Sequence, residues 1–460
     1  MSLTSTTRYT AVAAALVSGS LAGVTTAQAD ESTDQLLDRI DALDAELQAM
    51  KAEAKAQESE GDAISRVLDD AEKRSSGIHA MQTSPLMAGH DGKFVLRGEG
   101  DNGSFELNPN FQLQIRNVSN FYPENGDAFE DFENGWEIRR AKVGFKGHAF
   151  SEDLKYDLKF AFNRSGGAAV LENAFLEYAP EQGLFGSEGV GLVIGQWKDA
   201  TSYEESVSSS RQMAAERSLA NEELGGGFTD YVQGVGLTFE PNEGKWKAMV
   251  AYVDGPGSGN TNFTDDSAGG TAAGFSGRVD FILQGDDWKM FEDFTAMGNE
   301  AGGLRAGAGA FVSFGELGTE DTTSLVASAD VQWENAEGLA FFAAAYVNYL
   351  DLGPADATNF GLEGQVSQTF GNDNNWEGFG RYSVVIADTD VVRGTEAEDM
   401  FHEVTVGVNR YFEGHKVKAT VDLNWLLNGN AGSNSGLGYR EQTDDFEAQV
   451  AIRGQIQLLL

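Results

Sequence analysis

The sequence predicts an all-β fold: a sixteen-stranded antiparallel transmembrane β-barrel, preceded by a short α-helical coiled coil. Three observations predict the barrel. From about residue 93 onward, apolar and polar residues alternate with a period of two, which is typical of strands with one apolar and one polar face. The alternating segments number sixteen, and outer-membrane barrels have an even number of strands. Their connections sort by parity into a short set and a mostly long set, as in barrels whose turns and loops face opposite sides of the membrane.

The first residues predict export. Arg8 precedes the apolar run AVAAALVSGSLAGV, and Ala27-Gln28-Ala29 has the small-residue pattern of a cleavage site. We expect a signal peptide over residues 1–29, cleaved after Ala29, and a location in the cell outer membrane. A lone membrane anchor is the alternative, although the apolar run is short for a spanning helix. Because the chain has no cysteine, the exported fold must hold together without disulfides.

Residues 30–60 predict a periplasmic coiled-coil segment. The apolar residues step by four and three, which gives a heptad seam of Leu36, Ile40, Leu43, Leu47, Met50 and Ala54. A solvated amphipathic helix is the alternative. So short a coil is marginal alone and needs another contact to hold chains together. Residues 61–92, which contain several glycines and Pro85, predict a linker.

The predicted barrel spans residues 93–460. In LKYDLKFAFN, for example, the leucines and aromatics share one face, and Lys155, Asp157 and Lys159 share the other. The sixteen strands are expected at 106–121, 135–149, 153–164, 169–179, 189–198, 229–240, 245–254, 273–284, 304–315, 322–333, 338–350, 358–370, 376–387, 400–412, 416–427 and 444–458. The connection 285–303 is long, although its parity places it among the short turns.

Composition and motifs argue against several functions. The chain carries 72 acidic and 32 basic residues, so nucleic acid is not an expected partner, since its phosphates are bound by clustered Lys and Arg. GEGDNG at 98–103 matches a dinucleotide-binding pattern, but a strand follows it, which predicts a β-hairpin turn. The five histidines lack metal-ligand spacing and no nucleophile elbow occurs. We therefore expect no catalytic residue, metal site or cofactor; a secreted soluble β-rich enzyme is the alternative.

Scarce cations crowd into NGWEIRRAKVGFKGHAF, residues 134–150 of a chain with a formal net charge of −40. On a regular strand Arg139 falls on the apolar face, while the polar face carries Arg140, Lys142 and Lys146. Arg or Lys facing lipid costs about 2–4 kcal/mol at the membrane midplane, so we expect the polar face to line the lumen. The next strand adds Lys155 and Lys159. Such a row offers an anion a path of weak sites; the alternative is that these cations pair with luminal acids such as Asp157.

The connection 199–228 follows the fifth predicted strand and contains apolar residues of its own. A loop this long usually has a function or is disordered. We expect it to fold inward and narrow the pore. Its cations would then face those of the second and third strands: Lys198, Arg211 and Arg217.

Three motifs together resemble the phosphate-selective porin O and P family. RRAKVGFKG at 139–147 is similar to the family's early strand RRAxxGFxG, and ENAFLEY at 172–178 is similar to its next strand. GQWKDATSYEESVSSSRQMAAERSLA at 195–220 is similar to the family's constriction region, except that Ala200-Thr201 replaces a Pro-Phe pair. The motifs occur in the family's order over roughly residues 106–225.

The resemblance implies a homotrimeric outer-membrane porin for passive diffusion of small hydrophilic solutes and ions. It implies a third loop inside the lumen and a preference for small anions such as phosphate. Carried over by position, the implied lining is Arg140, Lys142, Lys146, Lys198, Arg211 and Arg217. The alternative function is a structural anchor in the outer-membrane lipid that tethers the membrane to the cell wall through the coiled coil.

Overall fold

A computed structural model describes the barrel and its N-terminal edge. The described residues are 87–90, 94–100, 103–122, 132–241, 244–260, 271–298, 301–317, 320–353, 355–371, 373–388, 399–428, 436–440 and 448–460. The predicted signal peptide and coiled coil lie outside these residues. The chain divides into two compact units, Met1–Thr83 and Ser84–Leu460, and all described residues belong to the second. Within the described ranges, no helix has the length and apolar character needed to span a bilayer.

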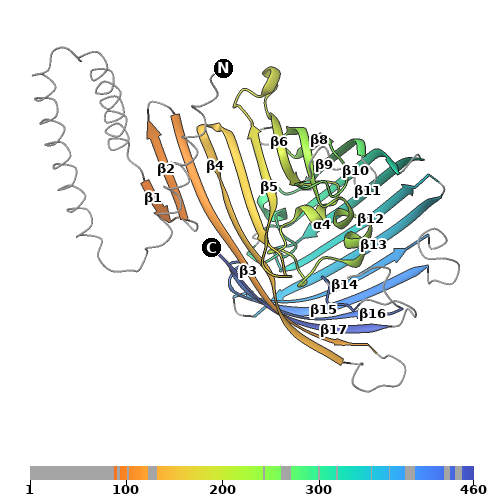
Figure 1. The fold of residues 1–460 in the computed structure, drawn as a ribbon. Helices are drawn as coiled ribbons and strands as arrows, with labels where there is room; N and C mark the ends of the chain where they lie inside the picture. The colour runs from red at the N-terminus through yellow and green to blue at the C-terminus, as the bar shows by residue number, and fades with distance from the viewer. Residues whose placement is uncertain are drawn as a thin grey trace, which may run out of the picture. The chain divides into compact units, whose positions relative to one another are not determined.

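Sixteen spanning strands form one closed antiparallel sheet, which confirms the predicted barrel. The elements are β3 (Gly103–Phe121), β4 (Phe132–Phe162), β5 (Ala169–Tyr178), β6 (Val190–Lys198), β7 (Tyr231–Phe239), β8 (Trp246–Val253), β9 (Thr271–Gln284), β10 (Gly303–Leu317), β11 (Glu320–Glu334), β12 (Leu339–Asp351), β13 (Asp356–Phe370), β14 (Trp376–Ile386), β15 (Met400–Glu413), β16 (Val417–Leu426) and β17 (Gln449–Leu459). Element β4 contributes two spans, because its first part pairs with β3 and its second part with β5. Strand β17 pairs with β3 and closes the ring (Figure 1).

Burial along each strand follows the alternation that the sequence predicts. In β13, Glu363 and Gln365 are 4% and 2% exposed on the luminal face, whereas Leu362 and Val366 are 53% and 46% exposed on the outer face. Apolar side chains on the outside suit contact with lipid, and polar side chains on the inside suit a water-filled or plugged lumen. The two faces of the barrel wall are therefore those of an outer-membrane protein.

The connections distinguish the two ends of the barrel. At one end, which we call the short-turn end, strands are joined by brief turns such as 335–338, 371–375 and 414–416. At the other, the long-loop end, they are joined by longer segments such as 199–230 and 427–448. In barrels of this kind the short turns face the periplasm and the long loops face the exterior.

A hairpin precedes the barrel. Strands β1 (Met87–His90) and β2 (Phe94–Gly100) pair with each other, and β2 pairs with the beginning of β3 through Gly100 and Gly103. The hairpin turn predicted at 98–103 is thus confirmed. Strand β1 lies within the predicted linker 61–92; its four residues, MAGH, have no alternation that would reveal a strand.

A β-bulge in β4 corrects the predicted orientation of Arg139. Arg140 pairs with Gln114, but the next pair joins Ile138 to Ile115, so Arg139 is an extra residue without a partner on β3. Such a bulge re-aims the side chains around it. The prediction that Arg139 lies on the apolar face is therefore wrong: both arginines point into the lumen, where they contact Glu216.

Residues 199–230 cross the lumen (Figure 1). This segment contains α4 (Tyr203–Ser206), α5 (Leu219–Leu224) and α6 (Gly226–Thr229). The hydroxyls of Ser202 and Ser218 cap the first two helices by accepting hydrogen bonds from backbone N–H groups three residues later. Backbone N–H groups of the segment reach the opposite wall: Leu219 donates to Glu403 of β15 at 3.0 Å, and Ala220 donates to Ser383 of β14 at 2.9 Å.

The long connection 285–302 folds into the lumen from the short-turn end, which explains why it departs from the parity of its neighbours. It contains the short 3-10 helix η2 (Trp288–Phe291). Phe291 and Phe294 are each 1% exposed, and the Tyr203 hydroxyl donates a hydrogen bond to the Phe291 carbonyl. Arg211 pairs with Glu292 at 2.5 Å. The two inward segments therefore meet and support each other.

Candidate pore constriction and lumen

The two inward segments cover one side of the lumen and leave the other side open. On the covered side, the luminal residues Ser383, Thr405 and Asn424 are fully buried. On the opposite wall, Lys146 and Lys155 of β4 are exposed. The luminal residues Gln114 and Arg116 of β3 are fully buried as well, so on the wall of β3, β4 and β5 the accessible part is the stretch of β4 that carries Lys146, Lys155 and Lys159.

A group that we call the arginine clamp holds the segment 199–230 against this wall. Glu216 receives Arg116 at 2.8 Å, Arg139 at 2.5 Å and Arg140 at 2.7 Å. Burial alone raises the pKa of the Glu216 carboxyl, but the charges of Arg139, Arg140 and Arg116 outweigh it and hold the pKa well below its usual value. The clamp thus joins the cations of the RRA motif to the glutamate of the ERSL motif, about which sequence spacing gives no information.

The loop cations are held by acids instead of facing the wall cations. Arg217 pairs with Glu205 at 3.1 Å, and Lys198 also pairs with Glu205. Burial raises the pKa of Glu205, but Arg217 and Lys198 outweigh it and lower that pKa to about 2. Arg211 is occupied by Glu292. Three of the predicted lining residues therefore fix the position of the two inward segments.

A second buried cluster fixes the start of the loop, and sequence reasoning missed it. Arg278 contacts Asp330 at 2.8 Å, and Arg305 contacts Asp280 at 3.0 Å. The Arg305 guanidinium lies 3.2 Å from the centre of the Tyr203 ring, a cation–π contact. In the sequence only Arg278 and Asp280 are near each other, so spacing does not reveal the cluster; the pairing of β9, β10 and β11 brings the four charged residues together.

The wall cations of β4 differ in how they are neutralised. Lys142 pairs with Glu172 of β5 at 2.5 Å. It therefore follows the alternative prediction, in which a wall cation pairs with a luminal acid. Within the described part of the chain, Lys146, Lys155 and Lys159 form no direct ion pair. Of the eight predicted lining residues, these three keep a charge that the protein itself does not bind directly.

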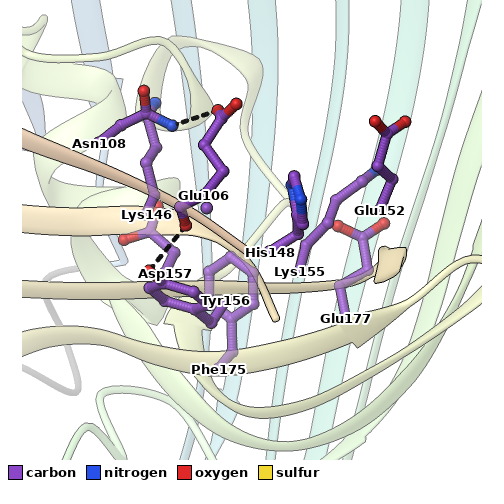
Figure 2. Close-up of a pocket in the computed structure, with 11 residues that line it drawn as sticks. Glu106, Asn108, Lys146, His148, Glu152, Lys155, Tyr156, Asp157, Phe175 and Glu177 are labelled. Carbon is purple, nitrogen blue, oxygen red and sulfur yellow. Dashed lines mark hydrogen bonds between the residues drawn. The ribbon is translucent and has the colours of Figure 1, made fainter. Parts of the chain in front are cut away.

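A cavity of about 530 Å³ lies beside Lys146 and Lys155 at the short-turn end (Figure 2). We call it the rim cavity. Its charged lining consists of Lys146, Lys155, Glu106, Glu152, Asp157 and Glu177, and it also includes Asn108, His148 and Tyr156. Among the described residues, no group of His, Asp and Glu is arranged to hold a metal ion. The arrangement suits the passage and weak binding of solutes.

These features define the class of the protein. A closed sixteen-stranded barrel with an apolar outer face, a polar lumen and a third loop that crosses the lumen is an outer-membrane channel of the porin class. More particularly, residues 105–284 match the model of the family described as phosphate-selective porin O and P. The match covers all three motifs and confirms the resemblance. No curated protein sequence matches the chain.

Solved structures support the fold. The anion-selective porin from Comamonas acidovorans is similar with a TM-score of 0.53 and 14% identity, over 77% of this chain and 100% of that chain. OprB from Pseudomonas putida gives a TM-score of 0.52 at 9% identity, over 78% and 95% of the two chains. OmpF from Salmonella typhi, solved with daunomycin, gives 0.51 at 15% identity, over 78% and 99%. At these identities the likeness establishes the fold alone.

Proposed function

We propose that the protein conducts small hydrophilic solutes and ions passively across the outer membrane, with a preference for anions such as phosphate. One observation carries the proposal: the open luminal wall presents Lys146, Lys155 and Lys159, which form no direct ion pair with any described residue, although the chain as a whole has a net charge of −40. The selectivity in the name of the matched family and in the name of the Comamonas porin agrees with it.

The mechanism is electrostatic guidance through a narrowed lumen. The two inward segments confine solutes to the side of β3, β4 and β5, so every solute passes close to the wall lysines. Because cations in a low-dielectric channel raise the local concentration of anions, and because several weak sites allow release, anions move faster than cations of equal size. Arg140 and Lys142 contribute less than the sequence suggests, since Glu216 and Glu172 bind them.

The test is the zero-current potential of the purified protein in a planar bilayer with a tenfold potassium chloride gradient. The wild type should give an anion-selective potential that collapses when Lys146, Lys155 and Lys159 are all changed to Met. A matched triple variant, with Lys245, Lys247 and Lys289 changed to Met, removes the same charge away from the open wall and should keep the potential. A cation-selective or neutral potential in the wild type would refute the anion preference, and the absence of channels would refute the function.

The first part of the chain adds further proposals. We propose a signal peptide over 1–29, a coiled coil over 30–60, a linker over 61–92 and a homotrimeric barrel embedded in outer-membrane lipid, with no catalytic residue or cofactor. The alternative of a cell-wall anchor depends on the coiled coil and finds no support in the family or structural comparisons. Deletion of residues 31–60 tests it, because a porin without the coil keeps conducting.

A further inference from the structure

The charges of the rim cavity differ from the other charges that line the lumen. In the arginine clamp every charged group has a partner of opposite sign. In the rim cavity, Lys146, Lys155, Glu152, Asp157 and Glu177 take part in no direct ion pair with described residues. Glu106 is the exception, since Arg97 of β2 pairs with it at 2.6 Å. The cavity thus presents two positive and three negative groups that are available to a solute.

Charges of both signs make the cavity selective. An anion such as phosphate is attracted by the two lysines but repelled by the three carboxylates. A simple cation is attracted by the carboxylates but repelled by the lysines. A molecule that carries an ammonium group and an anionic group can satisfy both sets at once. The volume of about 530 Å³ lies within the range of small-molecule sites, roughly 300–1,000 Å³.

The polar side chains of the lining are held in place by hydrogen bonds within the protein. Asn108 is 5% exposed, and its amide nitrogen donates to Glu106 at 2.6 Å, which fixes the orientation of the side chain. Its Oδ1 accepts no hydrogen bond, and Nε2 of His148, which stands in the same lining, has no partner either. Figure 2 shows Asn108 and Lys146 on one side of the cavity, and His148, Lys155, Glu152 and Glu177 on the other. Because both of these atoms have almost no accessible surface, a solute in the cavity meets the charged groups and not these two atoms.

We propose that the rim cavity is a binding subsite for small zwitterions of the amino-acid class. Lys146 and Lys155 hold the carboxylate of the solute, and Glu152 and Glu177 hold its ammonium group. The proposal rests on the proposed function, because a solute reaches this site through a conducting lumen. It extends that function from inorganic anions to solutes whose positive end passes the acidic rim.

The experiment measures single-channel current in constant potassium chloride while L-alanine is added, with lactamide as the uncharged isostere and lactate as the anion without an amine. Alanine should reduce the current in a saturable way, whereas lactamide should not and lactate should do so more weakly. The pair Glu152→Gln and Glu177→Gln should raise the half-blocking concentration of alanine about tenfold, since each charge-assisted hydrogen bond contributes strongly. Lys146→Met should also weaken the block by alanine, because it removes a cation that binds the carboxylate of the solute. Glu181→Gln, on the exposed turn after β5, should leave the block unchanged.

The outcomes separate the two proposals. If the channels conduct and show an anion-selective zero-current potential, but alanine acts no differently from lactamide, the subsite is refuted and the proposed function stands. If alanine blocks the acidic-pair variant and the Lys146 variant as well as the wild type, the site lies elsewhere and the inference fails. A protein that forms no channels overturns the proposed function and the subsite together.

Discussion

At the residue scale, Glu216 is the group on which the constriction most depends. Its carboxylate is 3% exposed and contacts Arg116, Arg139 and Arg140. Arg139 reaches it only because the bulge turns this side chain into the lumen. The cations that stand out in the sequence therefore serve first to position the loop. Alternation predicts the luminal face of the cluster, apart from the orientation of Arg139, but not its partner, because Arg139 and Glu216 are 77 positions apart in the sequence and only the fold brings them together.

Removal of this charge should release the loop. In Glu216→Gln three buried guanidinium groups lose their shared counterion, and breaking a buried ion pair costs about 3–5 kcal/mol. We expect larger and noisier single-channel conductance, together with faster proteolysis within 199–230. The Glu181→Gln variant removes an exposed carboxylate of the same type and should behave like the wild type. Unchanged conductance and proteolysis in the clamp variant would show that the loop is held by other contacts.

Glu222 of α5 makes the loop sensitive to pH. Burial, and then the charge of Glu205, raise the pKa of Glu222 from 4.5 to about 7. The folded state therefore holds a proton that the unfolded state releases, and the stability that this contributes is present below about pH 4.5 and is lost as the pH rises to about 7. The pKa of Glu205 is instead lowered to about 2. The stability that ionised Glu205 contributes is therefore present above about pH 4.5 and is lost as the pH falls toward 2.

The pH effect predicts a difference between wild type and Glu222→Gln. The variant lacks the titrating group, so its melting temperature relative to wild type should increase between pH 5 and pH 8. Thermal unfolding at several pH values measures this difference. A constant difference across that range would contradict the assignment to Glu222.

At the element scale, alternation predicted the spanning strands closely because lipid outside and polar contacts inside impose opposite demands on successive residues. Alternation failed to predict the structure where successive residues do not face lipid and lumen in turn. The bulge at Arg139 adds one residue without changing the composition, β1 is too short to alternate, and the fold of 285–302 depends on contacts with Tyr203 and β11. The parity rule did mark that connection as unusual, although it gave no reason.

Shortening the connection 285–302 should enlarge the pore. Replacing residues 286–301 by a two-residue turn removes η2, Phe294 and the partner of Arg211, and uncovers the luminal face of β10 and β11. We expect a higher single-channel conductance and a weaker anion preference, because solutes then pass far from the wall lysines. Shortening the connection 179–189, whose Phe185 is 90% exposed, to a two-residue turn serves as the control. If the two deletions had the same effect, the inward segment would not limit the passage.

At the scale of the whole molecule, the net negative charge of the chain and the lysines of the luminal wall lie in different regions. The net charge of −40 reflects the loops, turns and termini as well as the lumen. Inside the barrel, the clamp, the Arg278 cluster and the Lys142–Glu172 pair neutralise most charges in place. Composition alone could not reveal this, because net charge carries no information about which groups are paired.

The central claim is that solutes pass along the wall of β3, β4 and β5. Because the chain contains no cysteine, single introduced thiols test it without background. A negatively charged methanethiosulfonate reagent should reduce the current through Lys146→Cys and Lys159→Cys, which face the open lumen. It should leave Ser383→Cys, which is fully buried beneath α5, and Ala141→Cys, on the outer face, unaffected. Rapid block at residue 383 together with no effect at 146 and 159 would contradict the claim and place the passage on the opposite side.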